Sequence, residues 1–94
     1  MYVQRFERDG FVVYENVSDK FEGTTYFSIV NPKKRMKNDP NHKSHVHVDD
    51  YQAAIDVIDY VCKRMSKEKR KRIGQYIKSK ARQLVSGIPY YRMY

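Results

Sequence analysis

A chain of 94 residues supplies one small domain with a modest core, and at this size a deep catalytic cleft is not expected. Its 19 Lys and Arg exceed its 11 Asp and Glu, for a net charge of +8, while 14% aromatic residues argue against wholesale disorder. The single cysteine, Cys62, excludes an internal disulfide, and no apolar run is long enough for a membrane span or a signal peptide. We therefore expect a cytoplasmic protein without membrane contact.

The first half of the chain predicts an antiparallel sheet. Residues 2–8 and 11–17 carry the β-branched and aromatic side chains typical of strands, and Asp9 and Gly10 between them form a dipeptide favoured in tight hairpin turns. A third strand is expected over residues 24–30, ended by Asn31 and Pro32. After a polar loop, residues 44–48 alternate at a period of two and predict a short fourth strand. Strands this close together favour a meander.

The second half predicts two helices. One should begin at Asp49 or Asp50 and cover residues 50–65, with Asp56 and Asp59 on its outer, solvated face. The other should cover residues 67–86, with Ser66 as N-cap and Gly87 as the stop signal. A tail, residues 88–94, follows. The predicted fold class is a single α+β domain over residues 1–94, in which three to four short antiparallel strands precede two packed helices, the second strongly basic.

Positive charge gathers at the end of the chain. Of the 19 Lys and Arg residues, 11 follow Cys62, and Glu68 is the one acid there. Like charges three or four positions apart destabilise a helix slightly, so a helix this basic tolerates self-repulsion that a polyanion would relieve. A charge excess of this size indicates a negatively charged partner.

Our leading hypothesis is a small, non-enzymatic protein that binds DNA or RNA through the phosphate backbone. The predicted contacts are cations along both edges of the second helix, a second group in the 33–37 loop, and one tyrosine that could stack on unpaired bases. These residues are Lys67, Lys71, Lys78, Arg82, Arg72, Lys80, Lys33, Lys34, Arg35 and Tyr76. No pattern for sequence-specific recognition is present.

Two other kinds of partner stay open. An acidic protein presents much the same chemistry as a phosphate backbone, so the chain could be a regulator or inhibitor that docks its basic, tyrosine-rich face on an acidic partner. The predicted edge strand over residues 2–8 also allows two copies to pair as a homodimer.

Two short patches resemble a known enzyme family. His45, Val46 and His47, together with Tyr76 and Lys80, resemble the His-hydrophobe-His and Tyr-x-x-x-Lys elements of HUH endonucleases, the rolling-circle replication and relaxase family. The resemblance implies histidines that hold a metal and a tyrosine that attacks a DNA phosphate. Motifs this short recur by chance, and no upstream family motif accompanies them. Our expectation is therefore a protein without catalytic residues, metal or cofactor.

Overall fold

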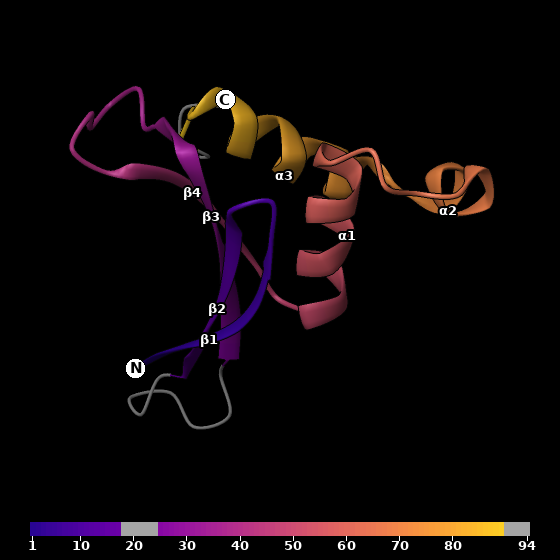
Figure 1. Ribbon diagram of the computed structural model, residues 1–94, viewed down its shortest axis with the longest axis horizontal. Helices are drawn as coiled ribbons and strands as arrows, with labels where there is room; N and C mark the ends of the chain where they lie inside the picture. Colours follow the sequence, from indigo (N-terminus) through magenta and orange to yellow (C-terminus); the bar gives the residue numbers. More distant parts are fainter. Residues whose placement is uncertain (18–24, 90–94) are drawn as a thin grey trace.

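The computed structural model describes residues 1–17 and 25–89, and it confirms the α+β organisation with an N-terminal antiparallel sheet (Figure 1). Four strands come first in the chain and helices follow. The elements are β1 (Tyr2–Arg8), β2 (Phe11–Val17), β3 (Thr25–Arg35), β4 (Lys43–Val48), α1 (Tyr51–Val61), α2 (Lys67–Arg72) and α3 (Gln75–Ser86).

The sheet is an antiparallel meander with the strand order β1-β2-β3-β4. Asp9 and Gly10 form the predicted turn between β1 and β2, with φ angles of 53° and 88°. Positive φ at both central positions is the requirement of a type I′ turn, whose twist matches that of the flanking strands. The register shifts once within β1, between Gln4 and Phe6.

β3 is longer than predicted, because Asn31 and Pro32 do not end it. Pairing with β2 ends at Val30, so the missing N–H of Pro32 leaves no bond of that ladder unmade. Towards β4 the register shifts between Asn31 and Arg35, and the Asn31 side chain accepts a hydrogen bond from the Lys33 N–H at 3.0 Å. The predicted loop 33–37 is therefore wrong in its first part, since Lys33 to Arg35 continue the strand.

α1 ends four residues before the predicted boundary at residue 65. Lys63 adopts a left-handed conformation, with a φ of 56°, and its N–H bonds to the carbonyl of Tyr60. The N–H of Arg64 bonds to the carbonyl of Asp59 at 2.9 Å. These two bonds are a Schellman motif, usually built on glycine, with a lysine in the left-handed position. The helix end therefore carries no glycine signal in the sequence.

The predicted helix 67–86 is two helices. Ser66 caps α2 as expected, accepting a hydrogen bond from the Lys69 N–H, but Ile73 and Gly74 then adopt extended backbone angles. Glycine inside a helix costs about 1 kcal/mol relative to alanine, and α2 also carries like charges on successive turns. The break lets Ile73 turn its side chain into the core, where it is 8% exposed, while α2 buries no residue.

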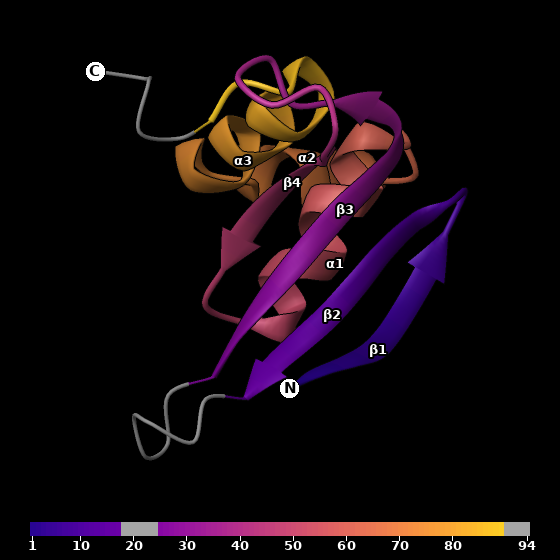
Figure 2. The ribbon, with the colours of Figure 1, turned by 90° about the vertical axis from the view of Figure 1, so that its left-hand side faces the viewer.

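One face of the sheet is covered by α1 and α3, and the core lies between these two layers (Figures 1 and 2). Near the C-terminus of α3, the carbonyl of Leu84 accepts hydrogen bonds from two buried polar side chains, Asn31 and Ser44. None of the described helices is long and apolar enough to cross a membrane. The fully buried core side chains come from both layers and include Val13, Ile29, Ala54, Val57, Ile58 and Leu84.

Candidate nucleic-acid interface

The three predicted contacts on α2 stand furthest from the core. Lys67, Lys71 and Arg72 are all exposed, on a helix that buries none of its side chains. In Figure 1 this helix projects away from the layer formed by α1 and α3. Among the described residues, none forms an ion pair with these three cations.

The predicted contacts on α3 lie beside a groove. Lys78 and Arg82, together with Lys63 from the end of α1, line a depression of about 280 Å³ between the two helices. Its remaining walls are apolar and come from Tyr60, Val61, Ala81 and Val85, the last of which is 46% exposed. The groove therefore combines a cationic rim with an apolar floor.

Tyr76 and Lys80 interact with each other and with the connection between β4 and α1. The Lys80 ammonium lies 5.6 Å from the centre of the Tyr76 ring, and the tyrosine oxygen has a backbone hydrogen bond with Asp49. Burial raises the pKa of Tyr76 and lowers the pKa of Lys80, and the nearby charge of Asp49 raises both. Tyr76 therefore has a structural contact as well as a ring that is 48% exposed.

The third predicted group lies at the far end of α3. Lys33, Lys34 and Arg35 are exposed, and the backbone of Arg35 lies against Gly87. Gly87 has a φ of 71°, and a Cβ at this position would come within 2.3 Å of the carbonyl oxygen of Arg35. Glycine is therefore required here by both the angle and the space, and it fixes the strand cations against the helix end.

The structure does not bring the predicted cations into the continuous rows of a single long helix. The break at Gly74 separates Lys67 and Lys71 from Lys78 and Arg82, so these four residues no longer share one helical edge. Three groups result instead, at α2, along α3 and at the end of β3. With 12 residues, α3 holds the outer groups about 18 Å or more apart.

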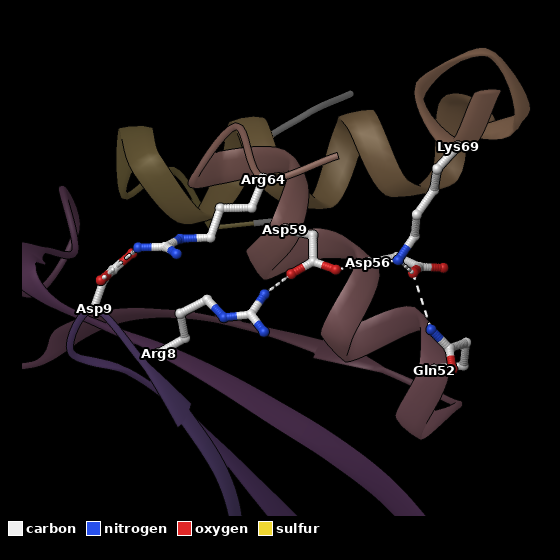
Figure 3. Close-up of polar contacts among 7 residues, drawn as sticks. All are labelled: Arg8, Asp9, Gln52, Asp56, Asp59, Arg64 and Lys69. Atoms are coloured by element: carbon white, nitrogen blue, oxygen red, sulfur yellow. Dashed lines mark hydrogen bonds and ion pairs between the residues drawn. The ribbon is translucent and has the colours of Figure 1, made fainter. Parts of the chain in front are cut away.

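Three cations close to these groups are neutralised within the domain (Figure 3). Lys69 of α2 contacts Asp56 at 2.9 Å and Asp59 at 3.1 Å. Asp59 also pairs with Arg8 of β1, and Arg64 contacts Asp9 at 3.2 Å.

The position of Asp59 corrects a prediction. Its expected place on the wet face of α1 is wrong, because it is 7% exposed and binds two cations from other elements. Val57, two positions before it on the helix, is fully buried, whereas Tyr51 in the first turn is 39% exposed. The polar side of α1 faces the β1–β2 hairpin and α2, which the helical period alone does not reveal.

The remaining predicted cations form a different class. Within residues 1–17 and 25–89, their side chains make no ion pair or hydrogen bond. These are Lys33, Lys34, Arg35, Lys67, Lys71, Arg72, Lys78 and Arg82.

Sequence reasoning missed a second surface, the sheet face opposite the helices. Tyr2, Tyr14 and Tyr26 share it with His45 and His47, since cross-strand partners point to the same side. The signal was present in the period-two spacing of His45 and His47, but strand register was needed to bring the tyrosines beside them.

No site for redox or metal chemistry is apparent in the described part of the chain. No three His, Cys, Asp or Glu side chains among the described residues gather closely enough to hold a metal ion. Cys62 packs against the core, and burial, with a hydrogen bond to Asp9, raises its pKa and keeps it a thiol.

Comparison of the chain with protein-family models, with curated protein sequences and with solved structures finds no match.

Proposed function

We propose that this protein binds nucleic acid without enzymatic activity, through the cations of α2, α3 and the end of β3. The observation that carries the proposal is the division of the cations into two classes. Acidic residues of the domain neutralise Lys69, Arg64 and Arg8, yet leave neighbouring cations such as Lys67 and Lys71 without a partner among the described residues. A phosphate backbone would supply the missing negative charge along the length of α3.

The spacing of the cations supports contact with an extended polyanion. Three separated groups, about 18 Å or more from end to end, exceed the size of a single phosphate or a small anionic ligand. A duplex or an extended strand presents phosphates over such a distance. None of the eight unpaired cations is held by a buried side chain in a fixed position that would recognise a particular base, so these cations support recognition of backbone charge.

Fluorescence anisotropy with a labelled 20-mer, duplex or single-stranded, at rising salt tests the proposal. The double variant Lys67→Gln/Lys71→Gln should weaken binding about tenfold at low salt and reduce the slope of log affinity against log salt by about 2. Each neutralised lysine removes about one phosphate contact and the counterion that it releases.

The matched control is Arg5→Gln/Arg64→Gln, which removes the same net charge from residues paired with Glu15 and Asp9. It should reduce binding clearly less than the double variant in α2. Absence of binding at micromolar protein and low salt would refute the proposal. Equal losses in the two double variants would reduce it to a net-charge effect without an interface.

The groove between α1 and α3 favours a second candidate, a regulator that docks on an acidic protein. Its cationic rim and the exposed Val85 on its floor fit a peptide that carries an acidic and an apolar side chain. Pulldown from a nuclease-treated lysate should then retain a partner that Val85→Asp releases. A partner lost on nuclease treatment would favour nucleic acid instead.

A further inference from the structure

The face of the sheet opposite the helices carries the aromatic rings of several tyrosines and histidines, arranged in rows across the strands. In Figure 2 the strands lie in front and the helices behind them. Strand register sets three neighbouring rows across this face. The rows are Tyr2, Asn16 and Tyr26; then Gln4, Tyr14, Ser28 and His47; then Glu7, Val12, Val30 and His45.

His47 contacts two neighbouring rings, and a shallow depression lies beside it. The His47 ring centre lies 5.1 Å from that of Tyr26 and 5.2 Å from that of His45. The buried Ser28 hydroxyl is 3.0 Å from Nδ1 of His47 and fixes the orientation of this ring. A depression of about 370 Å³ lies over Tyr2, Tyr14, Ser28, Val30, His45 and His47.

The ring at the centre of this face is held neutral. Desolvation lowers the pKa of His47, and repulsion from His45 and Lys80 lowers it further. At neutral pH the imidazole therefore presents an uncharged ring. Interaction with the side chain of Tyr26 raises the pKa of Tyr2, so this phenol is also uncharged at neutral pH.

Positive charge borders this ring surface at one end. Lys43 precedes His45 by two residues on β4 and so points to the same side of the sheet, and its partner in the register is Arg35. Both are exposed, and neither makes an ion pair within the described residues. Across the rows given above, Glu7 is the one acid that the described strands place on this face.

We propose that the ring surface of the sheet is a platform for the unpaired bases of a single-stranded nucleic acid, with phosphates reaching Lys43 and Arg35. The inference rests on the proposed function and names its substrate class. Bases stack on aromatic rings that lie open on a surface, and such stacking tolerates any sequence because every base has a flat π-face. The polar edges of Ser28, Asn16 and Gln4 then supply hydrogen bonds to the base edges.

Two other occupants fit the surface less well. A second copy packed face to face would bury Glu7, Arg35 and Lys43 together with several amides, while Val12 and Val30 are the only aliphatic side chains in the three rows. Burying charges without partners is costly. A duplex keeps its bases stacked inside the helix and presents only phosphates to a surface of this kind, so it would leave the rings unused.

The test compares a fluorescein-labelled single-stranded dT12 with a labelled duplex of the same length. The double variant Tyr14→Thr/His47→Thr keeps β-branched residues in the strands and removes two rings. It should weaken dT12 binding by about tenfold or more, given the stabilisation expected of each stacked base, and leave duplex binding and the salt slope unchanged. Tyr14→Phe/His47→Phe should retain the affinity for dT12, because it retains the rings.

The matched control is Tyr51→Ala, which removes a similarly exposed tyrosine from the first turn of α1, outside the ring surface. Circular dichroism confirms folding of each variant. Unchanged dT12 affinity in the Thr variant, or equal losses for both probes, would overturn the inference while leaving the proposed function in place. Failure of the wild type to bind either probe would overturn both, and a dimer that Tyr14→Thr/His47→Thr dissociates would identify a second copy as the occupant.

Discussion

Two sets of cations in this domain look alike in the sequence and differ in what surrounds them. Lys69 and Lys71 lie two residues apart in the same short helix, among other cations. Lys69 points towards α1 and forms ion pairs with Asp56 and Asp59. Lys71, in contrast, is exposed and has no ion pair among the described residues. A difference of two positions, or about 200° of helical rotation, separates a structural lysine from one available to a ligand.

The ion pairs of Lys69 explain how α2 is attached to the rest of the domain. A helix of six residues with no buried side chain has little stability of its own, since short helices rarely persist without tertiary contacts. The N-cap Ser66 closes the first turn of α2, and the ion pairs of Lys69 with Asp56 and Asp59 join this helix to α1. The paired cations therefore set where the unpaired ones stand.

The largest expected effect follows from removing the carboxylate that serves two cations. Asp59→Ala should lower the free energy of unfolding by about 2 kcal/mol, because Arg8 and Lys69 lose their buried partner. This is below the full cost of breaking a buried pair, since their side chains are 31% and 29% exposed. Urea denaturation followed by circular dichroism measures the loss.

Asp50→Asn is the matched control for that experiment. Asp50 is exposed at the N-cap of the same helix, and its side chain makes no capping hydrogen bond. Its replacement should change stability by less than about 0.5 kcal/mol. Equal effects of the two substitutions would show that the pairs around Asp59 contribute nothing to stability.

A smaller effect on stability and binding distinguishes Lys69 from Lys71 in α2. Lys69→Gln should cost about 1 kcal/mol of stability through the loss of its two ion pairs, with a modest change in nucleic-acid affinity. Lys71→Gln should leave stability unchanged within about 0.5 kcal/mol and weaken binding severalfold. Thermal melting and anisotropy on both variants measure the two quantities. The reverse pattern would contradict the division into paired and unpaired cations.

The smallest effect concerns pH and the ring surface. The folded state lowers the pKa of His47 from its ordinary value of 6.5, so the unfolded chain binds the proton more readily. Stability from this residue is therefore complete above pH 6.5 and declines as the pH falls through the folded-state pKa. His47→Gln should lose less stability than the wild type between pH 7 and pH 5.5 in urea titrations. Parallel pH profiles would show that His47 is not desolvated.

Several elements could be predicted from the sequence because their causes are local. The Asp9-Gly10 turn, the Ser66 cap and the stop at Gly87 each depend on the backbone preferences of one or two residues. The errors have two other causes. Lys63 ends α1 in a left-handed conformation that glycine usually supplies, so the residue type does not mark this helix end. β3 continues through Pro32 because β2 no longer pairs there, which depends on a strand distant in the sequence.

The candidate sites divide in the same way. The sequence by itself determined that the chain is strongly basic after Cys62 and that an antiparallel sheet of three to four strands precedes the helices, since composition and hydrophobic period are local properties. Only the tertiary structure decided which cations Asp56 and Asp59 neutralise, because that depends on how β1 and α2 pack against α1. It also gathered tyrosines and histidines from different strands on one open face, since strand register is a long-range property.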